Sequence, residues 1–321
     1  MKLKTRFSIL AFLIVVFAIV APIIVFFALG YRWDSQTNRL VPTGTLLVAS
    51  SPRDAEIYLN NKSSGHSTPA TLRLIVPGEY EISLQKEGYE PWNRRATIFE
   101  KRITVARDNN RPVALFLQQR QPQLLASSTA ALAQFNQLAA VPENEYVYSI
   151  NAGILTRGNK NLTDSRVLAD NLPEFTNYQI LESTGGHLFI LFDNSLYTHS
   201  ENTLTLTATN ITSGQWSSNG NYFTYYSQNT LWLYDATAGT YELITRTTAN
   251  IEDIAYDTQT HHIIYAAGSE IHSTEADYNT SRSSLKILDA NKPVLKLTLS
   301  RDGKTLYYLT EEEKLYSVLL R

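Results

Sequence analysis

Cysteine is absent from this sequence of 321 residues. The chain therefore has no disulfide framework, no thiolate nucleophile and no Cys-ligated zinc or iron–sulfur centre. An excess of one charge is also missing, because 28 Lys and Arg residues stand against 30 Asp and Glu residues. The resulting net charge of −2 gives no reason to expect a nucleic acid partner.

Motifs of common enzyme classes are missing as well. The sequence has no Gly-x-Ser-x-Gly elbow for a hydrolase nucleophile and no Gly-x-x-x-x-Gly-Lys-Ser/Thr loop for phosphates. His261 and His262 are adjacent, and adjacent strand residues face opposite sides, so they suit one metal ion poorly. Glu311–Glu313 falls at an expected hairpin tip, whereas Asp257 and Asp302 fall in turns, where Asp bonds local backbone groups. We expect no catalytic residue, no metal site and no cofactor.

One long apolar run lies near the N-terminus. Phe7 to Leu29 contains only one polar residue, Ser8, and no charge. At about 1.5 Å per residue such a helix spans roughly 35 Å, enough for a bilayer core of about 30 Å. Three cations precede it, at Lys2, Lys4 and Arg6, and the positive-inside rule then places the N-terminus in the cytoplasm.

A cleavable signal peptide is the alternative, since Ala28-x-Gly30 has small residues at suitable positions. The apolar run exceeds the about 7–15 residues of a signal-peptide core, which favours an uncleaved anchor. A buried core helix is disfavoured, because a helix apolar on all sides needs a large core around it. The expected boundaries are a cytoplasmic tail at residues 1–6, a transmembrane helix at 7–30 and a polar, aperiodic linker at 31–43.

Residues 44–119 predict a small β-sandwich. Pro77-Gly78 is a strong turn signal, and after it Tyr80, Ile82 and Leu84 alternate with charged or polar residues. This alternation indicates a half-buried antiparallel strand. Asn60-Asn61 tolerates positive φ and predicts another turn.

The motifs of this segment resemble the PEGA domain. They include Ser51-Pro52-x-x-Ala55, Gly65-x-x-Thr68-Pro69, Pro77-Gly78-x-Tyr80 and Lys86-x-Gly88-Tyr89. The sequence departs from the family's Pro-Glu-Gly-Ala pattern by placing Asp54 at the glycine position, which Asp tolerates because it can adopt the left-handed region. The resemblance implies display on a prokaryotic cell surface for binding or assembly, with no catalytic residues to transfer.

Residues 120–321 contain a repeated hairpin pattern. Five units begin at Asn144, Gly185, Gly220, Thr260 and Gly303, separated by 41, 35, 40 and 43 residues. A period of about 40 residues with strands in each unit predicts a β-propeller-like domain of about five blades. The third unit resembles a TolB-like or WD-type blade, with the turn Trp216-Ser217-Ser218-Asn219-Gly220, and Ser300-Arg301-Asp302-Gly303 repeats that turn.

The fifth unit stops without an outer strand. We expect Gln123–Ser127 to supply it and close the ring without exposed sheet edges. The alternatives are an open arc or a ring completed by another chain.

A basic cluster and one aromatic residue are the candidate binding residues. The cluster comprises Arg94, Arg95, Lys101, Arg102, Arg107 and Arg111, offset by Glu100 and Asp108. It could contact anionic headgroups or acidic wall polymers, although charged strand edges that deter aggregation are the favoured interpretation. Trp92 follows a turn and could either anchor a ligand or pack beneath the sandwich.

Together these patterns predict an all-β protein outside the membrane, held by one N-terminal helix. The favoured function is a non-catalytic binding or assembly module of a prokaryotic cell envelope, whose partner is a protein or a glycan. An extracytoplasmic enzyme acting on glycans or peptides through the propeller channel is the alternative. A transmembrane sensor is a weaker third hypothesis, since residues 1–6 offer little cytoplasmic machinery.

Overall fold

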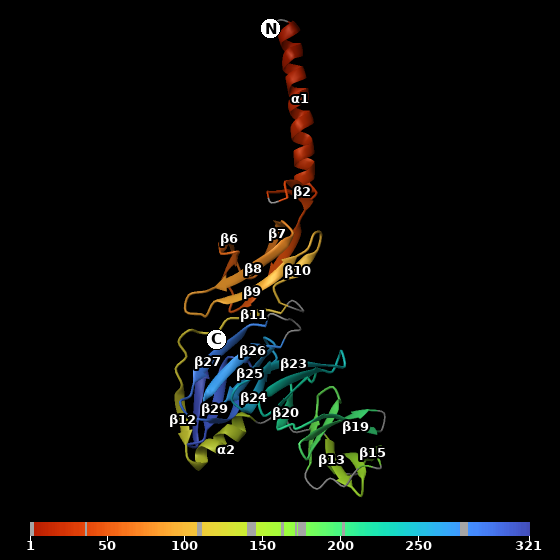
Figure 1. Ribbon diagram of the computed structural model, residues 1–321, viewed down its shortest axis with the longest axis vertical. Coiled ribbons are helices and arrows are strands. Elements are labelled where there is room, and N and C mark those ends of the chain that lie inside the picture. The colour runs from red at the N-terminus through yellow and green to blue at the C-terminus, as the bar shows by residue number, and fades with distance from the viewer. Residues whose placement is uncertain are drawn as a thin grey trace. The chain divides into compact units, whose positions relative to one another are not determined.

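The computed structural model describes residues 3–35, 37–107, 111–139, 146–161, 164–170, 172, 178–200, 203–276 and 282–321. The chain divides into two compact units, Met1–Leu115 and Phe116–Arg321. After one long N-terminal helix the structure is almost entirely β, as the sequence predicts (Figure 1).

The first unit begins with helix α1, Leu3–Ala28. Within it Ile9–Ala28 has a mean hydropathy of 3.3 and none of its surface is buried in the protein, which suits a membrane span or a signal sequence. It is the only helix of that length and composition in the described parts of the chain. The chain leaves the helix through Gly30, whose φ of 81° is readily adopted by glycine.

The residues that follow form a hairpin, although the sequence pattern predicts an aperiodic linker. Strand β1, Tyr31–Asp34, pairs antiparallel with β2, Arg39–Pro42. At its turn the Thr37 hydroxyl donates to Asp34 Oδ2 at 2.6 Å. Strands of four residues with mixed polarity show too little periodicity to be recognised in the sequence. The hairpin is visible only through the pairing of its two strands.

The sandwich of the first unit contains three small sheets. Their strand orders are β10-β3-β7, β6-β5-β8-β9 and β11-β4. The strands are β3 (Gly44–Val48), β4 (Ser50–Ser51), β5 (Glu56–Leu59), β6 (Lys62–Ser67), β7 (Ala70–Ile75), β8 (Gly78–Gln85), β9 (Trp92–Ile98), β10 (Ile103–Val105) and β11 (Val113–Ala114).

The apolar residues of these strands meet in one core. Ile82 and Leu84 are fully buried there, together with Leu46 and Ile57, which confirms the inward face predicted for this strand. Ser83, which the alternation places on the outward face, is buried as well. Asp54 has a φ of 63°, so Asp does occupy the left-handed position expected of it.

The second unit is a succession of five antiparallel sheets. The first has three described strands and each of the others has four. They are β13 (Tyr146–Asn151), β14 (Ile154–Asn159) and β15 (Ser165–Ala169); β16 (Tyr178–Glu182), β17 (Leu188–Phe192), β18 (Ser195–Ser200) and β19 (Thr203–Thr209); β20 (Ser213–Trp216), β21 (Tyr222–Ser227), β22 (Thr230–Asp235) and β23 (Thr240–Arg246); β24 (Ile251–Asp257), β25 (His262–Ala267), β26 (Glu270–Glu275) and β27 (Ser284–Asp289); and β28 (Val294–Leu299), β29 (Thr305–Thr310), β30 (Lys314–Leu319) and β12 (Gln123–Ser127).

These sheets confirm the hairpin repeat. The five predicted hairpins are β13–β14, β17–β18, β21–β22, β25–β26 and β29–β30. Asn144, the predicted start of the first hairpin repeat, lies outside the described residues. The first two sheets meet through β15 and β19. From the second sheet onward, consecutive sheets pack on one another mainly through their first strands, as β16 does on β20, β20 on β24 and β24 on β28. This arrangement fits a propeller-like repeat.

The predicted outer strand of the fifth sheet is confirmed. Strand β12 pairs antiparallel with β30, with Gln123 opposite Ser317 and Ser127 opposite Lys314. The beginning and the end of the second unit therefore meet in one sheet.

A helix that the sequence pattern did not predict covers this fifth sheet. Helix α2, Thr129–Leu138, packs Ala131 and Phe135 against Leu309 and Leu315. In the same sheet Leu306 and Tyr308 point the opposite way, because side chains alternate along a strand, and they too are buried. The helix thus occupies the face that a neighbouring sheet would cover in a closed ring, and the sheets form a row capped at this end by α2 (Figure 1).

Replacing Phe135 by Ala should lower the free energy of unfolding by about 3 kcal/mol, because it empties the contact between α2 and the fifth sheet. Leu132→Ala on the exposed side of the same helix is the control, with an expected change within about 0.5 kcal/mol. Denaturant unfolding of the full chain in detergent micelles measures both. Equal effects of the two substitutions would show that α2 is not a packing element.

Candidate functional site

Two members of the predicted binding set lie inside the sandwich. Along β9, Trp92 and Arg94 alternate with the exposed residues Asn93 and Arg95. Trp92 is part of the apolar core, so of its two predicted roles the structure has the packing one. The Arg94 guanidinium lies 5.8 Å from the Trp92 ring, and its Nη1 donates to the Ala106 carbonyl at 3.1 Å.

Arg107 is buried in the same way. The residue is only 1% exposed, and its Nη1 donates to the Pro112 carbonyl at 3.3 Å. A planar guanidinium can satisfy several carbonyls at once, which explains why arginine is tolerated here. The expectation that Arg94 and Arg107 contact an anionic surface is therefore corrected: both bind carbonyl groups of their own domain.

The remaining cations of the set stay at the surface. Arg95, Lys101 and Arg102 are exposed and Arg111 is half-buried, while Asp108 lies outside the described residues. Arg95 sits opposite Glu81 on the neighbouring strand β8, an arrangement typical of a solvated strand face. Lys101 and Arg102 lie together in the turn between β9 and β10.

A second candidate site, the turn row, lies in the second unit. We use this name for the four turns that join the first and second strands of successive sheets: Ser183–His187, Ser217–Tyr222, Asp257–His262 and Ser300–Thr305. Each begins with a buried or half-buried Ser or Asp and exposes polar residues at its tip.

The first side chain of each turn fixes the turn from within. The hydroxyl of Ser217 accepts the amide of Tyr222 at 3.0 Å, and that of Ser300 accepts the amide of Thr305 at 2.9 Å. The amides of Gly220 and Gly303 donate to the carbonyls of Ser217 and Ser300, both at 2.8 Å. The prediction that these two segments form the same turn is confirmed.

Neighbouring turns touch one another along the row. A Cβ atom at Gly220 would lie 2.9 Å from the amide nitrogen of Thr184 in the preceding turn. The Ser218 and Thr258 hydroxyls are 3.0 Å apart, which joins the third sheet to the fourth. A Cβ atom at Gly303 would lie 2.6 Å from Asp257 Oδ1, which brings the fifth sheet into the row.

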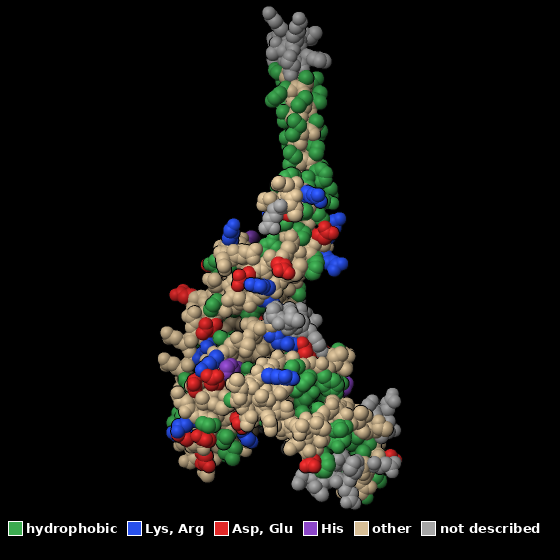
Figure 2. Space-filling view, in the orientation of Figure 1, with side chains coloured by type: hydrophobic (Ala, Val, Ile, Leu, Met, Phe, Trp, Pro, Cys, Tyr) green, Lys and Arg blue, Asp and Glu red, His purple; other side chains and the backbone are tan. Residues whose placement is uncertain are grey.

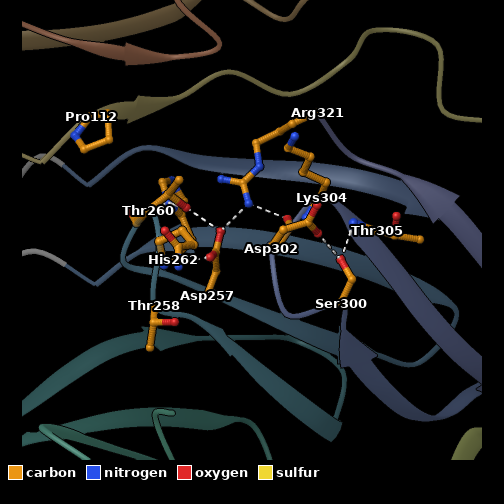
Figure 3. Close-up of polar contacts among 12 residues, drawn as sticks. Pro112, Asp257, Thr258, Thr260, His262, Ser300, Asp302, Lys304, Thr305 and Arg321 are labelled. Atoms are coloured by element: carbon orange, nitrogen blue, oxygen red, sulfur yellow. Dashed lines mark hydrogen bonds and ion pairs between the residues drawn. The ribbon is translucent and has the colours of Figure 1, made fainter. Parts of the chain in front are cut away.

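An ion pair lies beneath the last two turns (Figure 3). Arg321 Nη2 donates to Asp257 Oδ2 at 2.7 Å, and the two side chains are 5% and 4% exposed. Asp257 also accepts the Thr260 hydroxyl at 2.5 Å and the Gln259 amide at 3.0 Å, while Arg321 donates to the Gly303 carbonyl. The predicted turn role of Asp257 is confirmed, but its arginine partner, 64 residues away, left no signal in the sequence.

The same sheet carries a row of buried titratable side chains. Asp257, His262 and Glu275 lie opposite one another on β24, β25 and β26, and directly opposed residues share a sheet face. All three are nearly inaccessible to solvent. His262 Nδ1 lies 2.9 Å from the Thr260 carbonyl. Burial keeps this row from contact with a substrate, and its hydrogen bonds hold the turn instead.

Asp253 joins the fourth and fifth sheets. Its Oδ2 accepts the amide of Leu297 at 2.8 Å. Burial outweighs this hydrogen bond and raises the pKa of the Asp253 carboxyl to about 6.

Among the described residues, no group of three or more His, Asp or Glu side chains is placed to hold a metal ion. The exposed groups of the turn row are mainly hydroxyls and amides, with His187 in its first turn and Arg301, Asp302 and Lys304 in its last. Such groups can exchange hydrogen bonds with a polar partner.

Comparison with known proteins identifies one domain. Residues 43–113 match the PEGA domain, which confirms the resemblance seen in their motifs. No curated protein matches the chain.

Two solved structures show distant similarity. A chain of the crystal structure of a nidogen/laminin complex is 10% identical, with 52% of this chain and 68% of that chain covered and a TM-score of 0.36. A chain of the crystal structure of the mitotic checkpoint complex is 11% identical, with coverage of 90% and 80% and a TM-score of 0.43. At these TM-scores neither likeness bears on function.

Substituting Gly220 by Ala should destabilise the turn row. Its φ is 71°, and the added Cβ would press on the backbone of Thr184, so we expect a loss of about 2–4 kcal/mol in unfolding free energy. Gly239→Ala is the matched control, because its φ is 66° and nothing lies within 4 Å of its Cβ position. That control should cost only about 1 kcal/mol. Equal losses would mean that the turns do not press on each other.

Replacing Asp253 by Asn should alter the pH dependence of stability. Between about pH 4 and pH 6 the folded chain keeps the Asp253 proton and the unfolded chain has lost it, so stability declines as the pH rises through this window. The variant lacks this decline and should gain on the order of 2–3 kcal/mol relative to the unsubstituted chain by pH 7. Thermal unfolding at several pH values measures the difference.

Asp302→Asn is the control of opposite sign. Hydrogen bonds from the Ser300 hydroxyl and the Lys304 amide lower the pKa of Asp302, so its contribution to stability is present at neutral pH and lost on acidification. A parallel pH response of the two variants would contradict the assignment.

Proposed function

We propose that this chain is a membrane-anchored, extracytoplasmic binding or assembly protein of a prokaryotic cell envelope and that it is not an enzyme. Helix α1 would be the anchor, crossing the membrane once with residues 1–6 in the cytoplasm. Its support is the unburied apolar surface of Ile9–Ala28 and the cations Lys2, Lys4 and Arg6 that precede it.

In this proposal the PEGA domain is a spacer or docking unit between the membrane and the second unit. Its match at residues 43–113 supports an extracellular role. Buried Arg94 and Arg107 donate to carbonyls and so help to hold a small domain that has no disulfides.

The second unit, which we take as a propeller-like domain, would present the turn row to an envelope protein or glycan. The observation that carries this assignment is the contact of each turn with the next, through Thr184, Ser218, Thr258 and Asp257. Side chains of the turns use their hydrogen bonds to fix the backbone, so little conformational freedom remains to be lost on binding.

The alternative function, an extracytoplasmic enzyme for glycans or peptides, requires an acid and a base that reach a substrate. Among the described residues Asp257, His262 and Glu275 lie opposite one another but are buried. A partly exposed pair, His272 and Glu270, lies 3.0 Å apart, and its carboxylate already forms an ion pair with Lys286. We therefore favour binding.

Topology provides the first test. Protease added to intact cells should remove the domains after Tyr31 and leave a fragment that contains α1. Persistence of both domains under conditions that digest a known surface protein would contradict the orientation.

Binding provides the second test. Full-length protein in detergent micelles should sediment with a purified cell-wall fraction, and Ser218→Arg should weaken this binding roughly tenfold by covering the centre of the row. Asn136→Arg, on the exposed surface of α2, is the control and should bind normally. Equal binding by both variants would exclude the turn row as the contact surface.

A further inference from the structure

A chain of hydrogen bonds connects the end of helix α1 to the turn between β9 and β10. The Gly30 carbonyl accepts the amide of Thr43 at 2.9 Å and its hydroxyl at 2.6 Å. The Thr43 carbonyl in turn accepts the amide of Lys101 at 2.9 Å, and the Arg102 carbonyl accepts the amide of Thr45 at 3.0 Å. Through Thr43, these hydrogen bonds connect the turn between β9 and β10 to Gly30, which lies two residues after the end of α1.

Close packing fixes the same turn. A Cβ atom at Gly44 would collide with the Phe99 carbonyl oxygen and would lie 2.7 Å from Ile98 Cγ2. Only glycine at position 44 allows the turn between β9 and β10 to lie this close to the start of β3.

Four large apolar side chains around this point face solvent. Phe99 is 52% exposed in the turn, and Ile103, the first residue of β10, is 71% exposed. In the hairpin Trp33 is 61% exposed and Leu40 is 47% exposed. Together with Lys101 and Arg102 these residues form what we call the collar.

The hairpin directs its apolar side toward the helix. Trp33 is paired with Leu40, and alternation puts both on the face of Tyr31. The Tyr31 ring meets Phe26 of α1 edge-on, with ring centroids 5.8 Å apart. Trp33 is thus placed where amphipathic rings settle at a membrane interface.

Positive charge accompanies this apolar surface. Lys101 and Arg102 are exposed, and the Arg102 guanidinium lies 5.8 Å from the Phe99 ring. The hairpin adds exposed Arg32 and Arg39, and the acids on the same elements are Asp34, opposite Arg39, and Glu100. Figure 2 shows Lys and Arg side chains around the base of the apolar helix.

We propose that the collar docks on the membrane that α1 spans and binds the phosphate groups of anionic phospholipids there. The inference rests on the proposed anchor. Apolar side chains at the level of the headgroups, interspersed with cations, are the composition by which interfacial segments bind anionic lipid surfaces. Docking fixes the tilt of the PEGA domain on the membrane, which a single helix would leave free.

The absence of cysteine makes a direct test possible, because one introduced thiol is unique. Full-length Ile103→Cys, carrying an environment-sensitive fluorophore, is reconstituted in vesicles of phosphatidylcholine with 30% phosphatidylglycerol, a composition of about one-third anionic lipid. Brominated acyl chains should quench this label strongly. Asn93→Cys, exposed at the far end of β9 and roughly 20 Å away, is the matched label and should not be quenched.

Charge reversal tests the role of the cations. Lys101→Glu with Arg102→Glu should reduce the ratio of docked to free protein at least about tenfold, and so should vesicles of phosphatidylcholine alone. Arg95→Glu, an exposed cation outside the collar, should leave the quenching unchanged. An unchanged circular dichroism spectrum checks that each variant is folded.

The outcomes separate the collar from the anchor. Failure of the chain to float with vesicles would overturn the anchor and, with it, the collar. Flotation with an unquenched label at position 103 would overturn the collar alone. Quenching that is indifferent to lipid charge and to Lys101 and Arg102 would overturn the binding of anionic phosphate.

Discussion

The structure of the second unit depends on one constraint: the second strands of its last four sheets, β17, β21, β25 and β29, bury residues on both faces, so these sheets must be covered on both. A sheet in the middle of the row meets this requirement with a neighbour on either side. The fifth sheet packs on the fourth through β28, and helix α2 covers its Leu309 and Leu315 face with Phe135. Because each sheet packs on the next one along the chain, the first strands of the second to fifth sheets lie side by side. The turns that follow these strands are therefore neighbours too, and they form the turn row.

Polar groups set the spacing within that packing. Asp253 takes an amide from the next sheet, and Asp257 binds Arg321 from the fifth. Both carboxylates lie between sheets, where an unpaired charge would be costly, so each is matched by a donor from the neighbour. Apolar contact alone permits sliding of one sheet on another, whereas these directional bonds select one alignment.

Periodicity made much of the fold predictable. The hairpins could be located because one strand pair recurs about every 40 residues, and β12 could be located because the fifth unit has no outer strand of its own. The alternation of Ile82 and Leu84 likewise identified the inner face of the sandwich. Each of these features is local, or repeats a local pattern.

The interior of the sites could not be predicted in the same way. Arg94 resembles a surface cation in sequence, and only the carbonyl of Ala106, 12 residues later, makes its burial possible. Arg321 and Asp257 are 64 residues apart, and no spacing rule connects them. Helix α2 is short, and its Phe135 is recognisable as a core residue only once Leu309 and Leu315 are in place.

The pairing of β12 with β30 has a mechanical consequence. The chain enters the second unit just before β12, and this strand is held by the antiparallel ladder to β30 and by the bond from the Leu117 amide to the Leu320 carbonyl. A pull on the chain that precedes the unit would therefore load this ladder, together with the hydrogen bond from Arg120 Nε to the Ile287 carbonyl. Because the ladder joins the beginning of the unit to its end, such a pull acts on the hydrogen bonds of a whole sheet and not on a free end of the chain.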